Sequence, residues 1–223
     1  MQSKYESNPL ILSSAILVFP YTAVTFTNKN SIFGKMVKNF ALKAEKFILS
    51  LSKDINGEKV PHKISLLVKA SYLERTNQIY LEGLQLVQVH YIEQNSDDPY
   101  DILGFFSPVE EKEDLIPITN QLNYARVRRY FKEYVQTKIE NPIAKAELLG
   151  SLHRPHFVIH SLANLLLQYP QTGQKILEAQ SWTERIEIIL TNFSQLPPII
   201  SPKKDEPPTP KKELKHTFRR EID

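Results

Sequence analysis

The sequence predicts an α+β protein in which a curled β-sheet is followed by a helical bundle. Between residues 8 and 117, most runs are short, rich in β-branched and aromatic residues and bounded by turn signals, which is typical of strands. Between residues 118 and 196, apolar residues recur with the period of amphipathic helices. A single glycine inside the longest strand-like run indicates that the sheet bends. We therefore expect two subdomains, 8–117 and 118–196.

The composition is that of a globular protein and excludes several kinds of site. Of the 223 residues, 41% are hydrophobic and 24% are charged, and the net charge of +3 is only mildly basic. The chain has no cysteine, which excludes disulfides and thiolate sites and fits the reducing cytoplasm, where we expect the protein. The apolar run from Leu10 to Phe19 is too short to span a bilayer and lacks the basic leader of a signal peptide. We therefore expect no membrane partner.

Strand-like runs and one helix fill the first half. The runs LILSSAILVFPY and AVTFT are separated by Pro20, which cannot donate a hydrogen bond to a central strand. A helix follows, with Ser31 as its predicted N-cap. KFILSLS and HKISLLVKASYLE then return to the strand pattern on either side of a turn at Asn56 and Gly57. The predicted apolar stripe of the helix consists of Ile32, Met36, Phe40, Ala44 and Phe47.

The stretch NQIYLEGLQLVQVHYI, residues 77–92, is the longest strand-like run and contains Gly83. Ile79 and Leu81 share one face with Gly83, whereas Leu84 and Leu86 fall on the other face. Such a shift of the apolar face is typical of a β-bulge or a sharp bend, and small barrels turn their corners at bends of this kind. The sequence therefore predicts a barrel-like sheet, to which PYDILGFFSPVEE adds one more strand.

The second half predicts helices joined by short connections. RPHFVIHSLANLLLQY has Pro155 in its first turn, and TGQKILEA forms a short helix after it. SWTERIEIILTNFSQL begins with a capping box of Ser181 and Glu184. Residues 197–223 hold six of the 15 prolines and mix both charge signs, so we expect a disordered tail there. The apolar stripe of the first helix of this half is Val127, Tyr130, Phe131, Tyr134, Val135 and Ile139.

Residues 8–195 resemble the N-terminal domain of the Lon ATP-dependent protease family. The family opens with a P-L-x-x-x-V-x-F-P phrase, and this chain has PLILSSAILVFPYTAVTF, with Tyr21 where the family usually has glycine. Residues 80–89, YLEGLQLVQV, correspond to the family strand V-x-V-E-G-L-x-R-V-x-V, although an arginine is common where this chain has Gln85 and Leu86. Residues 184–190, ERIEIIL, correspond to the ERLE-x-LL helix that ends the family's bundle.

The resemblance implies a PUA-like β-barrel followed by a helical bundle, and a role in recognition. Lon N-terminal domains engage unfolded or damaged substrate proteins and help to assemble the protease particle. We therefore expect a stand-alone or isolated module whose partners are unfolded or misfolded protein segments, an ATP-dependent protease or further copies of the chain. Candidate contact residues for an apolar partner are Phe26, Asn28, Lys29, Asn30, Phe105 and Phe106.

Enzymatic activity is not expected. No two of the glycines have the G-x-x-x-x-G-K-S/T spacing of a phosphate-binding loop, and the Ser-Lys proteolytic centre of Lon lies in a separate domain. His156 and His160 lie one helical turn apart, as in zinc peptidases, and His153 is close by. No carboxylate follows as a third ligand, so we expect no metal and no cofactor, and we assign these histidines structural roles.

RNA binding is the alternative function. Arginines interleaved with aromatic residues in NYARVRRYFKEY are typical of surfaces that hold phosphates and stack on bases. The helical period also predicts a plain solvated stripe, so nucleic acid is not favoured. A third alternative, a small-molecule site in a cleft between barrel and bundle, stays open. The alternative RNA-binding residues are Arg126, Arg128, Arg129 and Lys132.

Overall fold

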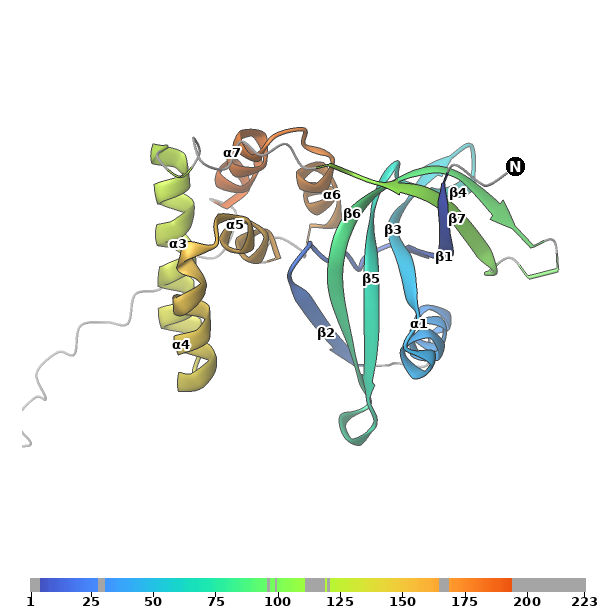
Figure 1. Ribbon diagram of the computed structural model, residues 1–223, viewed down its shortest axis with the longest axis horizontal. Helices are drawn as coiled ribbons and strands as arrows, with labels where there is room; N and C mark the ends of the chain where they lie inside the picture. Colours follow the sequence, from blue (N-terminus) through green and yellow to red (C-terminus); the bar gives the residue numbers. More distant parts are fainter. Residues whose placement is uncertain are drawn as a thin grey trace, which may run out of the picture.

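The computed structural model describes residues 5–27, 31–95, 97–98, 100–110, 119, 121–164 and 169–193. A curled sheet formed by the first half of the chain lies beside helices formed by the second half (Figure 1). The predicted α+β class and its order, sheet before helices, are confirmed. The strands are β1 (Glu6–Ser13), β2 (Ala23–Thr27), β3 (Lys46–Ile55), β4 (Glu58–Pro61), β5 (Ile64–Leu73), β6 (Gln78–Gln94) and β7 (Ile102–Pro108).

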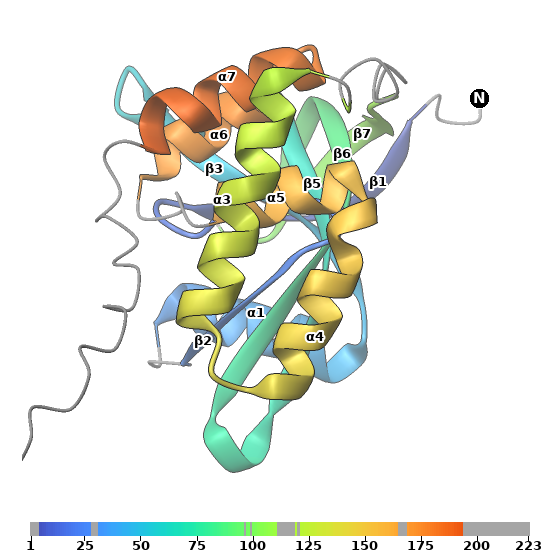
Figure 2. The same cartoon turned by 90° about the vertical axis from the view of Figure 1, so that its left-hand side faces the viewer.

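One helix, α1 (Ile32–Lys43), lies between β2 and β3, and the other α-helices follow the sheet. Those helices lie together on one side of the strands, with α3 and α4 foremost in Figure 2. In the part of the chain that the structure describes, no helix is long and apolar enough to cross a membrane. The later helices are α3 (Leu122–Lys138), α4 (Pro142–Gly150), α5 (Pro155–Asn164), α6 (Pro170–Glu178) and α7 (Trp182–Phe193), with short 3-10 turns η1 (Glu74–Thr76) and η2 (Ser151–His153).

Five of the strands form a ring. Antiparallel pairing joins β1 to β7, β7 to β6, β6 to β5 and β5 to β3, and a parallel pairing of β3 with β1 completes the circuit. The parallel register runs from Leu10 opposite Ile48 to Ser13 opposite Leu51. β2 pairs with β6, and β4 pairs with β3, outside this circuit. The glycine in β6 predicted that this strand bends within a barrel-like sheet. The prediction is confirmed, because β6 is one strand of the ring.

A β-bulge lies next to Gly83. Leu67 is opposite Gln85 while Val68 is opposite Gly83, so Leu84 is the extra residue of β6. The chain segment before β2 crosses β6 at this point: Gly83 N donates to Thr22 O, and Gly83 O accepts from Tyr21 N, both at 2.9 Å. A side chain at position 83 would collide with the carbonyl group of Phe19, which explains why the residue is glycine.

The N-cap of α1 is as predicted, but the buried face of this helix is not. Ser31 Oγ accepts from Gly34 N at 3.0 Å, which satisfies one of the free amides of the first turn. The buried residue of the face is Val37, flanked by Phe33 and Phe40. Ile32 is instead 53% exposed, and the helix ends before Phe47, which belongs to β3. The predicted stripe was wrong at Ile32, which is exposed at the first position of the helix, and it ran past the helix end at Ala44, the exposed C-cap residue, and at Phe47.

The helices after the sheet differ from the prediction by one element. Helix α4 was not predicted from the sequence; its N-cap Asn141 accepts from Ile143 N and Ala144 N. The capping box of α7 is confirmed with one change of partner. Ser181 Oγ accepts from Glu184 N at 3.2 Å, and the Glu184 carboxylate accepts from Gln180 N at 2.9 Å rather than from the N-cap residue.

The apolar core is continuous between sheet and helices. One buried cluster includes Phe19, Phe47 and Leu81 from the first half together with Phe131 and Trp182 from the helices. Close packing of this kind holds the two parts in one arrangement. A smaller second cluster lies among the strands and includes Leu10, Ile48, Leu67, Val87, Val89, Ile102 and Phe106.

Candidate protein-binding groove

A largely apolar groove of about 560 Å³ lies beside α1 and is here called the α1 groove. Apolar side chains of β1, α1 and β6 form its walls, and β4 and Tyr100 border it. Pockets that bury extended or small ligands are mostly apolar with a few polar groups, and this groove has that character. Its lining residues are Leu10, Ile11, Leu12, Ile32, Phe33, Met36, Glu58, Lys59, Val60, Ile92, Gln94, Tyr100 and Ile102.

Local structure at α1 presents apolar surface to this groove. Because Ser31 caps the helix, Ile32 is its first residue and lies at the edge of the packed face, where it is 53% exposed. Phe33 packs against Phe26 of β2, with ring centroids 5.7 Å apart, and Met36 lies one turn farther along. Three large apolar side chains of one helix therefore line the groove: Ile32 is exposed, whereas Phe33 and Met36 are partly buried.

The edge of β4 forms the opposite wall. The turn between β3 and β4 has Asn56 and Gly57 at φ 56° and 86°, and Gly57 N donates to Asp54 Oδ1 at 2.9 Å. Among the described strands β4 pairs only with β3. Consecutive side chains of a strand point to opposite faces, so three consecutive lining residues, 58–60, indicate that the strand's edge faces the groove. Such an edge has free backbone donors and acceptors that can pair with an extended segment.

The sequence-predicted contact residues are distributed over different surfaces. Phe26 is half-buried beside the α1 groove through its contact with Phe33. Phe105 is also half-buried and stacks on Tyr91, with centroids 4.3 Å apart, on a different part of the sheet. Phe106 has none of its surface exposed and lies in the smaller core cluster. The predicted residues Asn28, Lys29 and Asn30 lie outside the described residues.

The sequence patterns did not identify Ile32 and Tyr100 as exposed residues of a groove. They assigned Ile32 and Met36 to a buried stripe, although the predicted N-cap at Ser31 already placed Ile32 at the end of the helix. Tyr100, which is 50% exposed, carried no periodic signal because it lies in the connection between β6 and β7. Nothing in the sequence pairs α1 with β4, since these elements meet only through the fold.

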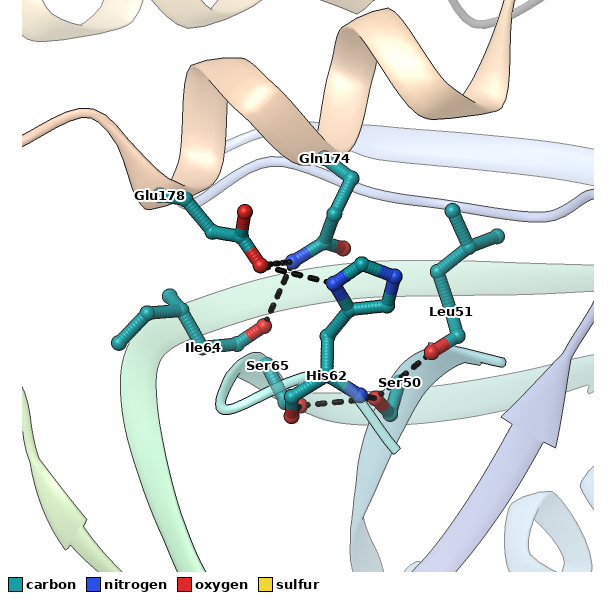
Figure 3. Close-up of polar contacts among 7 residues, drawn as sticks. All are labelled: Ser50, Leu51, His62, Ile64, Ser65, Gln174 and Glu178. Carbon is teal, nitrogen blue, oxygen red and sulfur yellow. Dashed lines mark hydrogen bonds and ion pairs between the residues drawn. The ribbon is translucent and has the colours of Figure 1, made fainter. Parts of the chain in front are cut away.

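A polar network joins the helices to the sheet at another place (Figure 3). Gln174 Nε2 of α6 donates to Ile64 O of β5 and to Glu178 Oε1, both at 2.9 Å. His62 Nδ1 donates to the same carboxylate oxygen at 2.8 Å, and His62 N donates to Ser50 Oγ at 3.0 Å. These hydrogen bonds join α6 to β5, although the buried atoms His62 Nε2 and Gln174 Oε1 have no hydrogen-bond partner among the described residues.

The histidines of α5 and of the turn before it make contacts within the fold. His160 is fully buried between Phe19 and Trp182, and its Nδ1 donates to Pro20 O at 3.1 Å. Burial lowers the pKa of His160 well below its usual range, and the positive charge of Arg185 lowers it further, so the ring is neutral. His153 Nδ1 donates to Gly150 O at 2.7 Å. Within the described ranges, no group of three metal-ligating side chains comes together.

The alternative RNA-binding residues all lie on the outer side of α3. Arg126, Arg128, Arg129 and Lys132 are exposed, whereas Val127 and Phe131 between them are buried. Arg129 Nε approaches Glu133 Oε1 at 3.8 Å, and its guanidinium lies over the Tyr130 ring at 5.5 Å. A cleft between sheet and helices, the third alternative, also exists: it has about 340 Å³ and is bordered by Tyr21, Tyr80 and Phe157 among others.

Comparison with known proteins supplies the fold assignment. No family model matches the chain, and no curated protein matches it by sequence. Among solved structures, the N-terminal domain of a Mycobacterium avium complex Lon protease aligns with a TM-score of 0.53 and 13% identity, covering 85% of this chain and 98% of that one. The chain has the Lon N-terminal domain fold. A Lon N-terminal domain protein from Xanthomonas campestris aligns with a TM-score of 0.52 and 14% identity, covering 86% of this chain and 99% of that one.

The backbone conformation at Tyr21 bears on the departure from the family sequence noted at this position. Tyr21 stands where the resemblance leads us to expect glycine, and its φ of 62° lies in the left-handed region that favours glycine. The backbone keeps the conformation because Tyr21 N is held by Gly83 O. The ring, 55% exposed, packs against His156 at 4.9 Å between centroids. This chain therefore has a tyrosine at a position where the backbone conformation favours glycine.

Proposed function

We propose that this protein is a non-catalytic recognition module of the cytoplasm that binds exposed apolar segments of unfolded proteins in the α1 groove. The observation that carries the proposal is the combination of an apolar groove with the free edge of β4 along one wall. Unfolded chains differ from folded ones in two ways that such a site can recognise: exposed apolar side chains and unpaired backbone groups.

An extended polypeptide suits the groove better than a folded partner. Backbone groups of an extended segment can pair with β4, while alternate side chains enter the space between α1 and β1. Glu58 and Lys59 carry opposite charges on the same wall, so neither a strongly acidic nor a strongly basic segment is preferred. Burying the exposed surface of Ile32 and Tyr100 would contribute about 25 cal/mol per Å² of apolar area.

The fold supports this proposal, because the similar solved structures are N-terminal domains of Lon proteins. By resemblance to those domains, bound segments would be passed to an ATP-dependent protease, and the module would act as its adaptor or regulator. A charged partner is not needed for this function, so binding should tolerate salt.

Fluorescence anisotropy with a labelled, denatured casein tests the proposal. Ile32→Asp places a charge in the groove and should weaken binding by about tenfold or more. Leu42→Asp is the matched control, because Leu42 is on the same helix, is 66% exposed and does not line the groove. Equal losses in the two variants, or no loss in Ile32→Asp, would show that casein binds elsewhere.

RNA binding at Arg126, Arg128, Arg129 and Lys132 is the second candidate, favoured by the exposure of all four side chains. Labelled single-stranded RNA in the same assay separates the two functions. Phosphate contacts weaken steeply as salt rises, whereas apolar contacts do not. Salt-sensitive binding of RNA, without binding of casein, would replace the first proposal.

A further inference from the structure

A hollow of about 360 Å³ lies along the outer side of α3, away from the α1 groove, and is here called the α3 hollow. We propose that the α3 hollow binds a phosphate monoester group carried by a phosphorylated serine or threonine of a partner protein. The proposal is independent of the apolar groove, since no residue lines both. The lining residues are Thr119, Tyr124, Ala125, Arg128, Arg129, Lys132 and Leu152.

Helical spacing brings the three cations together. Residues at i, i+3, i+4 and i+7 share one face of a helix, and positions 125, 128, 129 and 132 have this spacing. Ala125 has the smallest side chain of these four residues, so it leaves open space beside the three cations. Leu152 of η2 forms the other side of the hollow. Arg126 lies on the same helix and is exposed, but it does not line the hollow.

The charges of the hollow are poorly compensated within the described structure. Lys132 lies three and four residues after Arg129 and Arg128, so like charges face one another. Among the described residues, Arg129 is the one cation of the three that forms an ion pair. Its Nε lies 3.8 Å from Glu133 Oε1, and the two side chains are 63% and 47% exposed. A doubly charged anion between the three cations would replace repulsion by attraction.

Chemical features of the lining favour phosphate. Two guanidinium groups provide planar pairs of N–H donors, whose geometry matches phosphate oxygens, and Lys132 adds a compact positive charge. Burial raises the pKa of the Tyr124 phenol, partly offset by the charge of Arg128, so the phenol stays protonated and can donate as well. Ala125 and Leu152 offer apolar contacts to the carbon atoms next to a phosphate ester.

The compactness of the cluster favours a single phosphate over a polynucleotide. The lining cations lie within five consecutive residues, and Glu133 follows at once. Polynucleotides are held by several successive phosphate contacts along a basic surface. A phosphorylated side chain needs only the one site, which is the mode by which arginine clusters recognise phosphorylated proteins.

The test compares a labelled peptide that contains one phosphoserine with the same peptide lacking phosphate, by fluorescence anisotropy on the full chain. We expect the phosphorylated peptide to bind about tenfold more tightly or better. Arg128→Gln and Arg129→Gln should each remove most of this preference. Arg126→Gln, with the same change of charge on the same helix, should keep it. Inorganic phosphate should compete for the site.

Several results would overturn the proposal. Equal binding of the two peptides, or an equal loss in Arg126→Gln, would mean that the basic face acts only through its net charge. Competition by inorganic phosphate without preference for the phosphopeptide would identify a site for small anions instead. Tighter, Arg128-dependent binding of single-stranded RNA would assign the face to nucleic acid. Arg128→Lys keeps the positive charge but loses the paired N–H donors. A folded Arg128→Lys variant that loses the preference for the phosphopeptide would show lost recognition and not lost folding.

Discussion

The carbonyl group of Phe19 lies against the α-carbon of Gly83, where the segment before β2 crosses the bulge of β6. A Cβ at position 83 would overlap the carbonyl oxygen and lie 2.8 Å from the carbonyl carbon and 2.9 Å from Leu66 Cδ2. Two backbone hydrogen bonds, between Gly83 and residues Tyr21 and Thr22, fix the crossing. This contact determines the path by which the chain passes from the ring to β2. A change of side-chain rotamer cannot make room for a Cβ at position 83, because the obstructing carbonyl group belongs to the backbone.

Gly83→Ala should therefore destabilise the protein by about 1–3 kcal/mol or more, since the overlap forces a backbone shift. Urea unfolding followed by circular dichroism measures the free energy of unfolding. Gly150→Ala is the matched control: apart from its chain neighbours and its own helix backbone, no described atom lies within 4 Å of the added methyl group, and Gly150 ends α4. Alanine there should be neutral or stabilising by up to about 1 kcal/mol. Equal stability of the two variants would show that the crossing can relax.

Tyr21→Gly should be more stable than Tyr21→Ala by about 1 kcal/mol. Both variants lose the packing of the ring on His156, but only glycine adopts φ of 62° without steric cost. The difference between their unfolding free energies isolates the backbone strain from the loss of the side chain. If the alanine variant is as stable as the glycine variant, the backbone at this position is not strained.

Stability should fall as the pH is lowered below about 6.5, in part because of His160. Burial, followed by the charge of Arg185, holds the pKa of His160 well below its unfolded value. The unfolded state then binds a proton that the folded state does not, so the free energy of unfolding decreases by up to about 1.4 kcal/mol per pH unit below the unfolded pKa.

The variant His160→Gln tests this origin, because glutamine does not titrate and its amide can still donate to Pro20 O. We expect a flatter dependence of unfolding free energy on pH between about 5 and about 7. His153→Gln, at an exposed position, is the control and should retain the parental slope. A slope that persists in His160→Gln would assign the pH dependence to other groups.

Gln174→Leu should cost about 1–3 kcal/mol, because it leaves Ile64 O and part of the Glu178 carboxylate without their donor at a buried position. Gln171→Leu removes an exposed amide from the same helix and should change stability by less than about 0.5 kcal/mol. Thermal unfolding of both variants measures the difference. Similar midpoints would indicate that water replaces the Gln174 amide.

Helices, strands and their cap residues were predicted from the sequence more successfully than the residues that line the candidate site. Ser31 and Ser181 were correct as cap residues because a cap is read within one turn of chain. The groove residues were not found, since Ile32 had the same apolar character as a core residue and only its neighbours decide exposure. Of the α3 hollow, only the row of cations on α3 was visible in the sequence.

Sequence alone determined the order of sheet and helices, the bend in β6 and the cationic side of α3, because each depends on residues close together in the chain. Tertiary structure decided the parallel pairing of β1 with β3, which completes the ring. It also brought α1 and the edge of β4 to one groove, and Leu152 to the cations of α3. The physical reason is that these contacts join segments whose local patterns are independent, so their meeting depends on how the whole core packs.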